Sequence, residues 1–148
     1  MWYYKNKPME TLSSFPQGTY GFIYRTTHIP SGKAYIGKKV LYHQKKVKLT
    51  KKELLEYTHV AGRKPAYKIA MNESDWQKYY GSHKEIMGMI REGKEEEFKR
   101  EILELVTTKK LLTYYELKYQ MLYQVLEKPN EFFNDNILGK FYRKDFDE

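Results

Sequence analysis

Two tyrosines in a predicted β-hairpin are the first side chains in this sequence whose type and spacing could do chemistry. Tyr24 and Tyr35 lie eleven residues apart, in β-like segments on either side of a turn at 29–33. A symmetric turn would pair the two tyrosines on one face of the hairpin, with Lys39 on the same face by alternation. Such a pair can stabilise a hairpin, and a nearby cation can also lower the pKa of a phenol and fit it for acid–base work.

Glu116 is the third candidate, and it lies in a segment, 110–127, whose spacing of apolar residues predicts a helix. Its neighbours one turn away on that helix include no cation. A carboxylate bordered by apolar and aromatic groups is costly unless a positive group satisfies it. A metal ion would do so, and so would a lysine from elsewhere in the fold; the spacing does not separate these alternatives.

All of the excess positive charge lies in one stretch. The 148 residues include 27 basic and 19 acidic side chains, a net charge of +8. The stretch from Lys38 to Lys68 holds ten basic residues against two acids, so its surplus equals the charge of the whole chain. This concentration indicates a segment that contacts phosphate groups, and the alternative is a solvated lysine face that serves solubility.

Several classes of protein are excluded by what the sequence lacks. It has no cysteine, which rules out disulfides and thiolate metal sites and fits a reducing cytoplasm. P-loop, dinucleotide-binding, zincin and α/β-hydrolase motifs are missing, and the four histidines form no recognisable ligand set. No apolar run reaches the length of a membrane span or a secretory signal, so we expect a soluble, unexported protein.

The elements that must position these residues follow from local patterns. Breakers in residues 1–18 predict an irregular arm. In the hairpin, Ile23 and Ile36 face the core, away from the tyrosines. A third strand is expected at 98–105, and three capping-box patterns predict helix starts, at 50–53, 74–77 and 82–85. The helix at 110–127 is expected to bury one stripe: Leu111, Tyr115, Leu122 and Leu126.

These features together resemble the GIY-YIG nuclease family. Gly21-Phe22-Ile23-Tyr24 stands for the first signature, with Phe22 as an extra residue, and Tyr35-Ile36-Gly37 matches the second. The resemblance continues in order through Tyr79-Tyr80-Gly81-Ser82, the strand at 98–105, Glu116 and Phe133-Asn134, and covers residues 19–137. The Tyr-Tyr-Gly-Ser segment and the ending Asn-Asp-Asn-Ile-Leu-Gly-Lys look most like small, stand-alone phage members.

The resemblance implies an α/β fold with a three-stranded, mainly antiparallel sheet flanked by helices. The expected organisation is an N-terminal arm at 1–18, a single nuclease domain at 19–140 that contains a basic insertion at 38–72, and a tail at 141–148. The implied activity is hydrolysis of phosphodiester bonds in duplex DNA with one divalent ion, Mg²⁺ or Mn²⁺.

Roles for single residues are carried over from the same resemblance. Glu116 would bind the metal, Tyr24 would be the base or orient the water, Tyr35 would be its partner, and Asn134 would lie near the phosphate. The family arginine is missing from its usual place, so Arg63 is expected to take its role, with Lys39 as the alternative. Lys39 and Tyr35 are expected to lower the pKa of Tyr24, so that cleavage speeds up from about pH 6.5 to 9.

The expected DNA contacts are ten further residues, most of them in the basic stretch: Lys38, Lys45, Lys46, Lys48, Lys51, Lys52, Lys64, Lys68, Tyr80 and Ser82. The leading role by resemblance is a homing or free-standing endonuclease of phage type in the cytoplasm of a bacterial host; restriction, DNA degradation and junction resolution stay open. The rival functions are a catalytically silent DNA-binding module on the same scaffold and an RNA-binding protein that stacks bases on its aromatics. The sequence does not indicate an oligomeric state.

Overall fold

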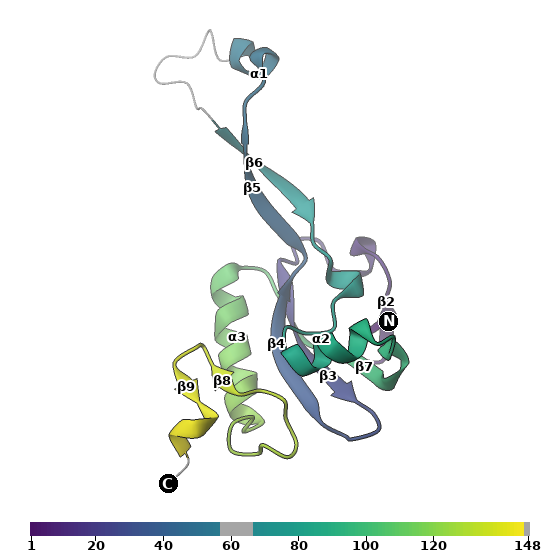
Figure 1. The fold of residues 1–148 in the computed structure, drawn as a ribbon. Helices are drawn as coiled ribbons and strands as arrows, with labels where there is room; N and C mark the ends of the chain where they lie inside the picture. Colours follow the sequence, from purple (N-terminus) through teal and green to yellow (C-terminus); the bar gives the residue numbers. More distant parts are fainter. Residues whose placement is uncertain (57–66, 147–148) are drawn as a thin grey trace. The chain divides into compact units, whose positions relative to one another are not determined.

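The computed structural model describes residues 1–56 and 67–146, and these form two compact units (Figure 1). The first unit comprises Met1–Leu41 and the chain from Asp75 onward, and the second comprises Tyr42–Ser74. In the described part of the chain, no helix is long and apolar enough to cross a membrane.

A five-stranded mixed sheet forms the centre of the first unit, in the order β2-β1-β7-β3-β4. Its three predicted strands are present as β3 (Gly21–His28), β4 (Ala34–Val40) and β7 (Phe98–Val106), with β3 antiparallel to both neighbours. Strands β1 (Trp2–Tyr4) and β2 (Lys7–Met9) extend the sheet, with β1 parallel to β7. The sheet is therefore mainly antiparallel, as expected, and has two strands more than expected.

The prediction of an irregular segment at residues 1–18 was wrong for its first half. Trp2 is 1% exposed, its indole N–H donates to the carbonyl of Trp76 at 2.7 Å, and its ring packs edge-on against Phe22 and Tyr24. Lys5 and Asn6, both with positive φ, form the short β1–β2 turn, and Ser13 and Ser14 lie in the turn η1 (Leu12–Ser14). Long-range burial of an aromatic ring thus orders a segment that has little local propensity for structure.

The register of the β3–β4 hairpin differs from the prediction by two residues. Tyr24 lies opposite Gly37, and Tyr35 lies opposite Thr26. Because side chains alternate with a period of two, this shift leaves every side chain on its expected face. The tyrosines therefore still share one face, and Ile36 lies in the core on the other.

Helix α3 (Lys109–Leu122) packs on the face that carries Ile23 and Ile36. Two positions of its predicted stripe, Leu111 and Leu122, are exposed. Leu112 and Gln120 are buried instead, so the inward face includes polar positions that a search for apolar periodicity passes over.

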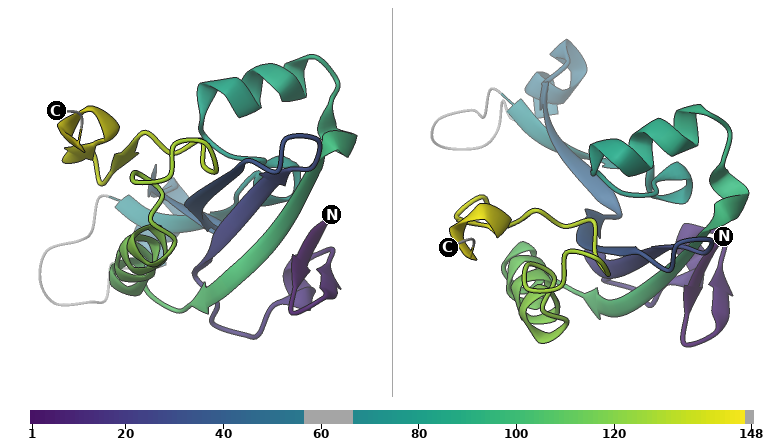
Figure 2. Two further views of the ribbon diagram at one scale, coloured as in Figure 1. Left: turned by 90° about the horizontal axis from the view of Figure 1, so that it is seen from below. Right: turned by 60° about the horizontal axis from the view of Figure 1, so that its bottom comes forward.

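Helix α2 (Lys84–Arg91) lies on the opposite side of the sheet from α3 (Figure 2). Ile86 of α2 packs with Phe98 on the side that carries Tyr35. The pattern at 82–85 does start this helix, but His83 is the N-cap in place of Ser82, and its Nδ1 accepts from the amide of Glu85. The pattern at 74–77 starts only the short turn η2 (Trp76–Lys78). The remaining short elements of this unit are η3 (Glu95–Glu97), β8 (Asn136–Ile137), β9 (Phe141–Tyr142) and η4 (Arg143–Phe146).

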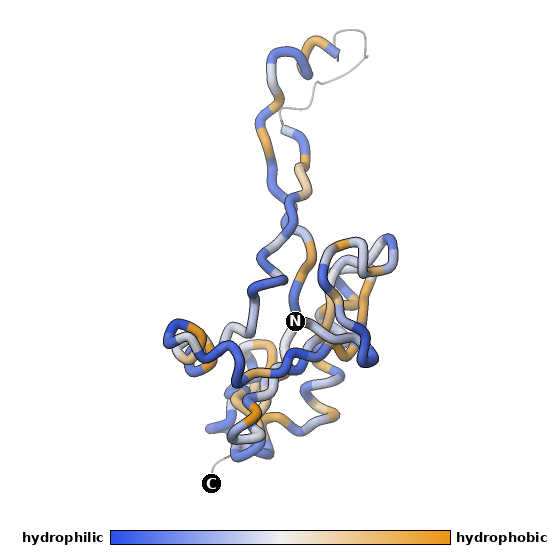
Figure 3. The backbone as a smooth tube through the Cα atoms, turned by 90° about the vertical axis from the view of Figure 1, so that its right-hand side faces the viewer, coloured by the Kyte–Doolittle hydropathy of each residue, from blue (hydrophilic) through white to orange (hydrophobic). Residues whose placement is uncertain are grey.

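The second unit is a two-stranded antiparallel ribbon with a short helix. Strands β5 (Tyr42–Lys48) and β6 (Tyr67–Glu73) pair along their full length. Helix α1 (Lys51–Glu56) begins at the predicted capping box, in which Thr50 and Glu53 bond each other's backbone N–H groups. In Figure 3, hydrophobic positions are scattered along a mostly hydrophilic ribbon.

Candidate active site

The two motif tyrosines lie side by side on one face of the sheet but differ in exposure. Their ring centroids are 6.2 Å apart. Tyr24 is fully buried, and its hydroxyl donates to the hydroxyl of Tyr79 at 3.3 Å. Tyr35 is only partly buried, and its hydroxyl shares a hydrogen bond with Ser82 Oγ at 3.0 Å. Tyr35 therefore presents the pair to solvent, while Tyr24 supports it from behind.

Glycine at position 37 is required by the close approach of the Tyr24 ring. A Cβ atom on Gly37 would lie 2.6 Å from the Tyr24 hydroxyl and 2.9 Å from the Tyr35 ring. Gly81 has a φ of +141°, a conformation that side chains disfavour, and a Cβ there would contact both tyrosines. Gly37 thus provides the space in which the two phenols lie, whereas Gly81 is required by its backbone conformation.

Glu116 points from α3 toward the same region and is largely buried. Its side chain is 14% exposed, and Lys38 Nζ lies 3.8 Å from Glu116 Oε1, too far for a hydrogen bond. Burial raises the pKa of the Glu116 carboxyl, and the charge of Lys38 only partly opposes this. Of the two alternatives for satisfying Glu116, a lysine does approach it, but the carboxylate keeps the capacity to bind a cation.

A pocket of about 380 Å³ lies between Glu116 and Tyr35 at the outer edge of β4, the edge away from β3. Its wall is polar and is built from β4, the start of α2, one face of α3 and the loop that precedes β8. It is lined by Tyr35, Ser82, His83, Lys84, Glu116, Gln120, Asn134, Asp135, Asn136 and Leu138. Of the three residues proposed for the chemistry, Tyr35 and Glu116 line this pocket, whereas Tyr24 does not.

The oxygen atoms in this pocket fit a hard divalent cation. Gln120 follows Glu116 by one helical turn; its Nε2 donates to the carbonyl of Ile36 at 3.0 Å, and its buried Oε1 has no hydrogen-bond partner. Carboxylate and amide oxygens are the protein ligands that Mg²⁺ accepts, usually with several waters. In the parts of the chain that the structure describes, no three acidic, histidine or cysteine residues cluster as a metal site.

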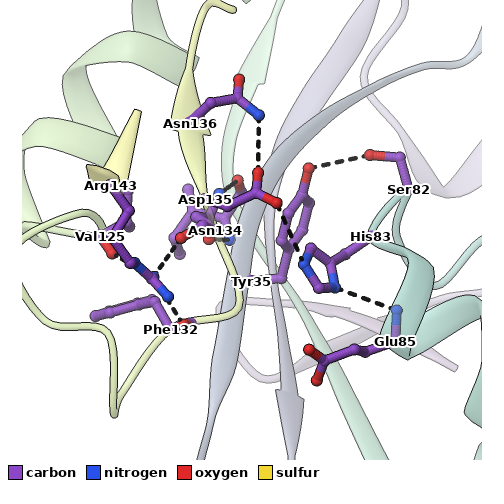
Figure 4. Close-up of polar contacts among 11 residues, drawn as sticks. Tyr35, Ser82, His83, Glu85, Val125, Phe132, Asn134, Asp135, Asn136 and Arg143 are labelled. Atoms are coloured by element: carbon purple, nitrogen blue, oxygen red, sulfur yellow. Dashed lines mark hydrogen bonds and ion pairs between the residues drawn. The ribbon is translucent and has the colours of Figure 1, made fainter. Parts of the chain in front are cut away.

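Asn134 is bound to the edge of β4. Its side chain accepts from the Ile36 N–H at 3.0 Å and donates to the Ile36 carbonyl at 2.8 Å, so it imitates a neighbouring strand. The guanidinium of Arg143 fastens the same loop by donating to the carbonyls of Val125, Phe132 and Asn134 (Figure 4). These two hydrogen bonds hold β4 at the pocket wall, which Asn134 itself lines, and its expected place near the phosphate stays a prediction.

His83 is a pocket residue that the sequence analysis passed over. Because Nδ1 accepts the Glu85 amide, the neutral ring carries its proton on Nε2, which lies 3.8 Å from Asp135 Oδ2 (Figure 4). The sequence did contain one signal: His83 directly follows Ser82 at a predicted helix start, and a side chain at a helix N-terminus can bond the free backbone N–H groups there.

Of the two predicted cationic partners of the tyrosines, Lys39 and Arg63, only Lys39 lies within the described residues. Lys39 does lie on the tyrosine face; its Nζ is 4.0 Å from the centre of the Tyr79 ring and donates to Asp75. Arg63, like Lys64, lies outside the described residues. None of the arginines in the described ranges lines the pocket, where the positive side chain is Lys84.

The predicted DNA contacts fall into three groups. Ser82 lines the pocket, and Lys38 lies beside Glu116. Tyr80 stacks on the guanidinium of Arg100 at 4.0 Å and is thereby engaged in the fold. The other described lysines all belong to the second unit and are exposed: Lys45, Lys46, Lys48, Lys51, Lys52 and Lys68.

The expectation that the pKa of Tyr24 is lowered was wrong for the protein without a bound ion. Burial is the main cause that raises this pKa well above 10, and Tyr79, Tyr35 and Glu116 raise it further. Burial also raises the pKa of Tyr35, against a smaller opposite effect of the Ser82 hydrogen bond. Both phenols are therefore neutral at physiological pH, and act as donors and acceptors of hydrogen bonds.

Comparison with known families decides the relationship. Residues 2–137 match the family model described as "Putative endonuclease segE, GIY-YIG domain". The chain belongs to this GIY-YIG family. No curated protein and no solved structure matches the chain. The matched residues include β1 and β2.

Proposed function

We propose that this chain is a divalent-metal-dependent endonuclease that hydrolyses phosphodiester bonds of duplex DNA in the pocket beside β4. The observation that carries this proposal is Glu116, a largely buried carboxylate that the nearest lysine only partly neutralises, in one pocket with the motif residue Tyr35. Family membership supports an endonuclease domain, and the charge of the second unit supports a polyanionic substrate.

In this mechanism Glu116 would hold one Mg²⁺ or Mn²⁺ ion, and the side-chain oxygen of Gln120 in the same wall would be available to it. The ion, when bound, neutralises charge on the phosphoryl oxygens and lowers the pKa of water. Burial of Glu116 suits this role. The buried carboxylate lacks the stabilisation that water would give it, and a bound cation would supply that stabilisation instead.

The neutral phenols orient the reacting water in this proposal. Tyr35 lines the pocket and offers its hydroxyl, while Tyr24 holds the Tyr35 ring and links it to Tyr79. A raised pKa disfavours Tyr24 as a free phenolate base. Because its buried hydroxyl donates to Tyr79, Tyr24 would serve the water-orienting role only indirectly, by holding Tyr35 at the pocket. His83 Nε2–H and the Lys84 ammonium are the donors available to the phosphate.

The test is incubation of supercoiled plasmid with the protein and Mg²⁺, Mn²⁺ or EDTA. Wild type is expected to nick or linearise the plasmid only with a divalent ion, and Glu116→Gln is expected to lose at least about a hundredfold of the rate. Glu127→Gln is the matched control, because this exposed glutamate lies in the turn that follows α3. Cleavage that survives in Glu116→Gln would refute the metal ligand.

Binding without cleavage in wild type, with an affinity that falls steeply with salt and does not respond to Mg²⁺, would instead identify the silent DNA-binding module. Preference for single-stranded RNA in competition with duplex DNA would identify an RNA-binding protein. A homing or free-standing role of phage type stays a prediction from family resemblance, to be tested by mapping cleavage sites in genomic DNA.

A further inference from the structure

One face of the β5–β6 ribbon combines cations, an amide and large apolar side chains. The pairing register and the alternation of side chains place Tyr42, Gln44, Lys46, Lys48, Tyr67, Ile69, Met71 and Glu73 on this face, here called the reading face. The opposite face carries His43, Lys45, Val47, Lys68, Ala70 and Asn72. The two faces therefore differ in chemistry as well as in direction.

The apolar side chains of the reading face are exposed to solvent. Tyr67 is 58% exposed, Ile69 64% and Met71 52%. Among the described residues of this unit, only Leu49 is buried, so the ribbon has no core that these side chains could serve. A two-stranded ribbon is marginally stable alone in water, and three large apolar groups on one face point to a partner that covers them.

The charge of the reading face indicates the chemistry of that partner. Lys46 and Lys48 have no ion pair within the described part of the chain, whereas Lys68 on the opposite face is paired with Glu53 at 2.5 Å. Unpaired lysines beside exposed apolar groups suit a polyanion that also offers apolar contacts. A lipid surface fits less well, because the edges of an open ribbon expose backbone N–H and C=O groups that need water.

We propose that the reading face enters the major groove of duplex DNA and selects the sequence at which the nuclease acts. The major groove admits a two-stranded ribbon, whereas the deep, narrow major groove of A-form RNA does not. Gln44 suits the adenine edge, Lys46 suits guanine, and Ile69 and Met71 suit thymine methyl groups. This inference rests on the proposed function and adds the element that gives it sequence preference.

The experiment separates binding from cleavage by using Glu116→Gln protein to select bound sequences from a randomised duplex library. A combined reading-face variant, Gln44→Ala with Ile69→Ser and Met71→Ser, is compared with an opposite-face control, His43→Ala with Asn72→Ala. The reading-face variant is expected to lose about tenfold or more of the preference for the selected sequence over random DNA, and the control to keep it within about twofold. Circular dichroism and melting of both variants verify the fold.

An unchanged sequence preference in the folded reading-face variant would overturn the inference and leave the nuclease proposal intact. Absence of any sequence preference in the parent Glu116→Gln protein would also overturn the inference. Stronger binding of this protein to anionic phosphatidylserine vesicles than to duplex DNA would overturn it as well. Conversely, a wild-type protein that cleaves nothing with Mg²⁺ or Mn²⁺, but whose sequence preference is lost in the reading-face variant, would refute the nuclease proposal and support the reading face.

Discussion

Replacing Asn134 by alanine removes the side chain that closes the edge of β4. Asn134 is 2% exposed and makes two hydrogen bonds to the backbone of Ile36. After the change, the Ile36 carbonyl still accepts from Gln120, but its buried N–H loses its partner. An orphaned buried donor costs about 1–3 kcal/mol and the second lost bond about 1 kcal/mol, so we expect the free energy of unfolding to fall by about 2–4 kcal/mol.

Urea denaturation and thermal melting measure this loss. Each kcal/mol moves the melting temperature of a chain of this size by about 2–4 °C, so the expected decrease is about 4–16 °C. Asn130→Ala is the matched control, because this exposed asparagine lies in the turn before the same loop, and its stability is expected to change by less than about 0.5 kcal/mol.

The competing role for Asn134 is direct contact with the DNA phosphate, which the family resemblance implies. If that role dominated, Asn134→Ala would keep wild-type stability and lose only cleavage. Unchanged unfolding together with lost activity would therefore refute the reasoning from its hydrogen bonds.

Three other predictions follow from the site. Burial raises the pKa of Glu116, so protonation is favoured in the folded state and stability is lost as pH rises through the folded pKa. Glu116→Gln is therefore expected to melt about 2–4 °C higher than wild type at pH 8, with the gain vanishing near pH 4. An equal or lower melting temperature of the variant at pH 8 would contradict this. Gly37→Ala is expected to lower the free energy of unfolding by about 1–3 kcal/mol and to remove most of the cleavage rate. Gly88→Ala, with open space around the added Cβ, is expected to keep wild-type stability and cleavage rate. Equal effects of the two changes would contradict the packing argument. The pH dependence of single-turnover cleavage from pH 6.5 to 9 is expected to be the same in wild type and Tyr24→Phe, and a slope lost in the variant would restore Tyr24 as the base.

The face assignment of the hairpin could be predicted because it depends only on the period of a strand. Tyr24, Tyr35 and Lys39 fell on one face even though the register was shifted by two residues. Glu116 was found because an acid without a local cation is conspicuous in a helix. Whether a lysine or a metal ion satisfies Glu116 could not be decided from the sequence. Lys38 comes from β4, far from Glu116 in the sequence, and the burial of Glu116 depends on packing.

Features fixed by long-range contacts could not be predicted from local patterns. Trp2 joins the sheet because its ring fits beside Tyr24, a contact across more than twenty residues that turn residues do not signal. His83 takes the cap position expected for Ser82, whose hydroxyl shares a hydrogen bond with Tyr35. The direction of the Tyr24 pKa shift was misjudged because burial, which depends on packing, is its main cause, and the neighbouring groups raise the pKa further.

The loop at 131–134 lies along the outermost strand, where Ala34 and Ile36 would otherwise present bare backbone groups. An uncovered strand edge is a template for pairing with another molecule, so this loop also guards the protein against self-association. Changes that loosen it would therefore produce aggregates along with inactive enzyme, and the pocket wall could not be redesigned freely without first securing that edge by other means.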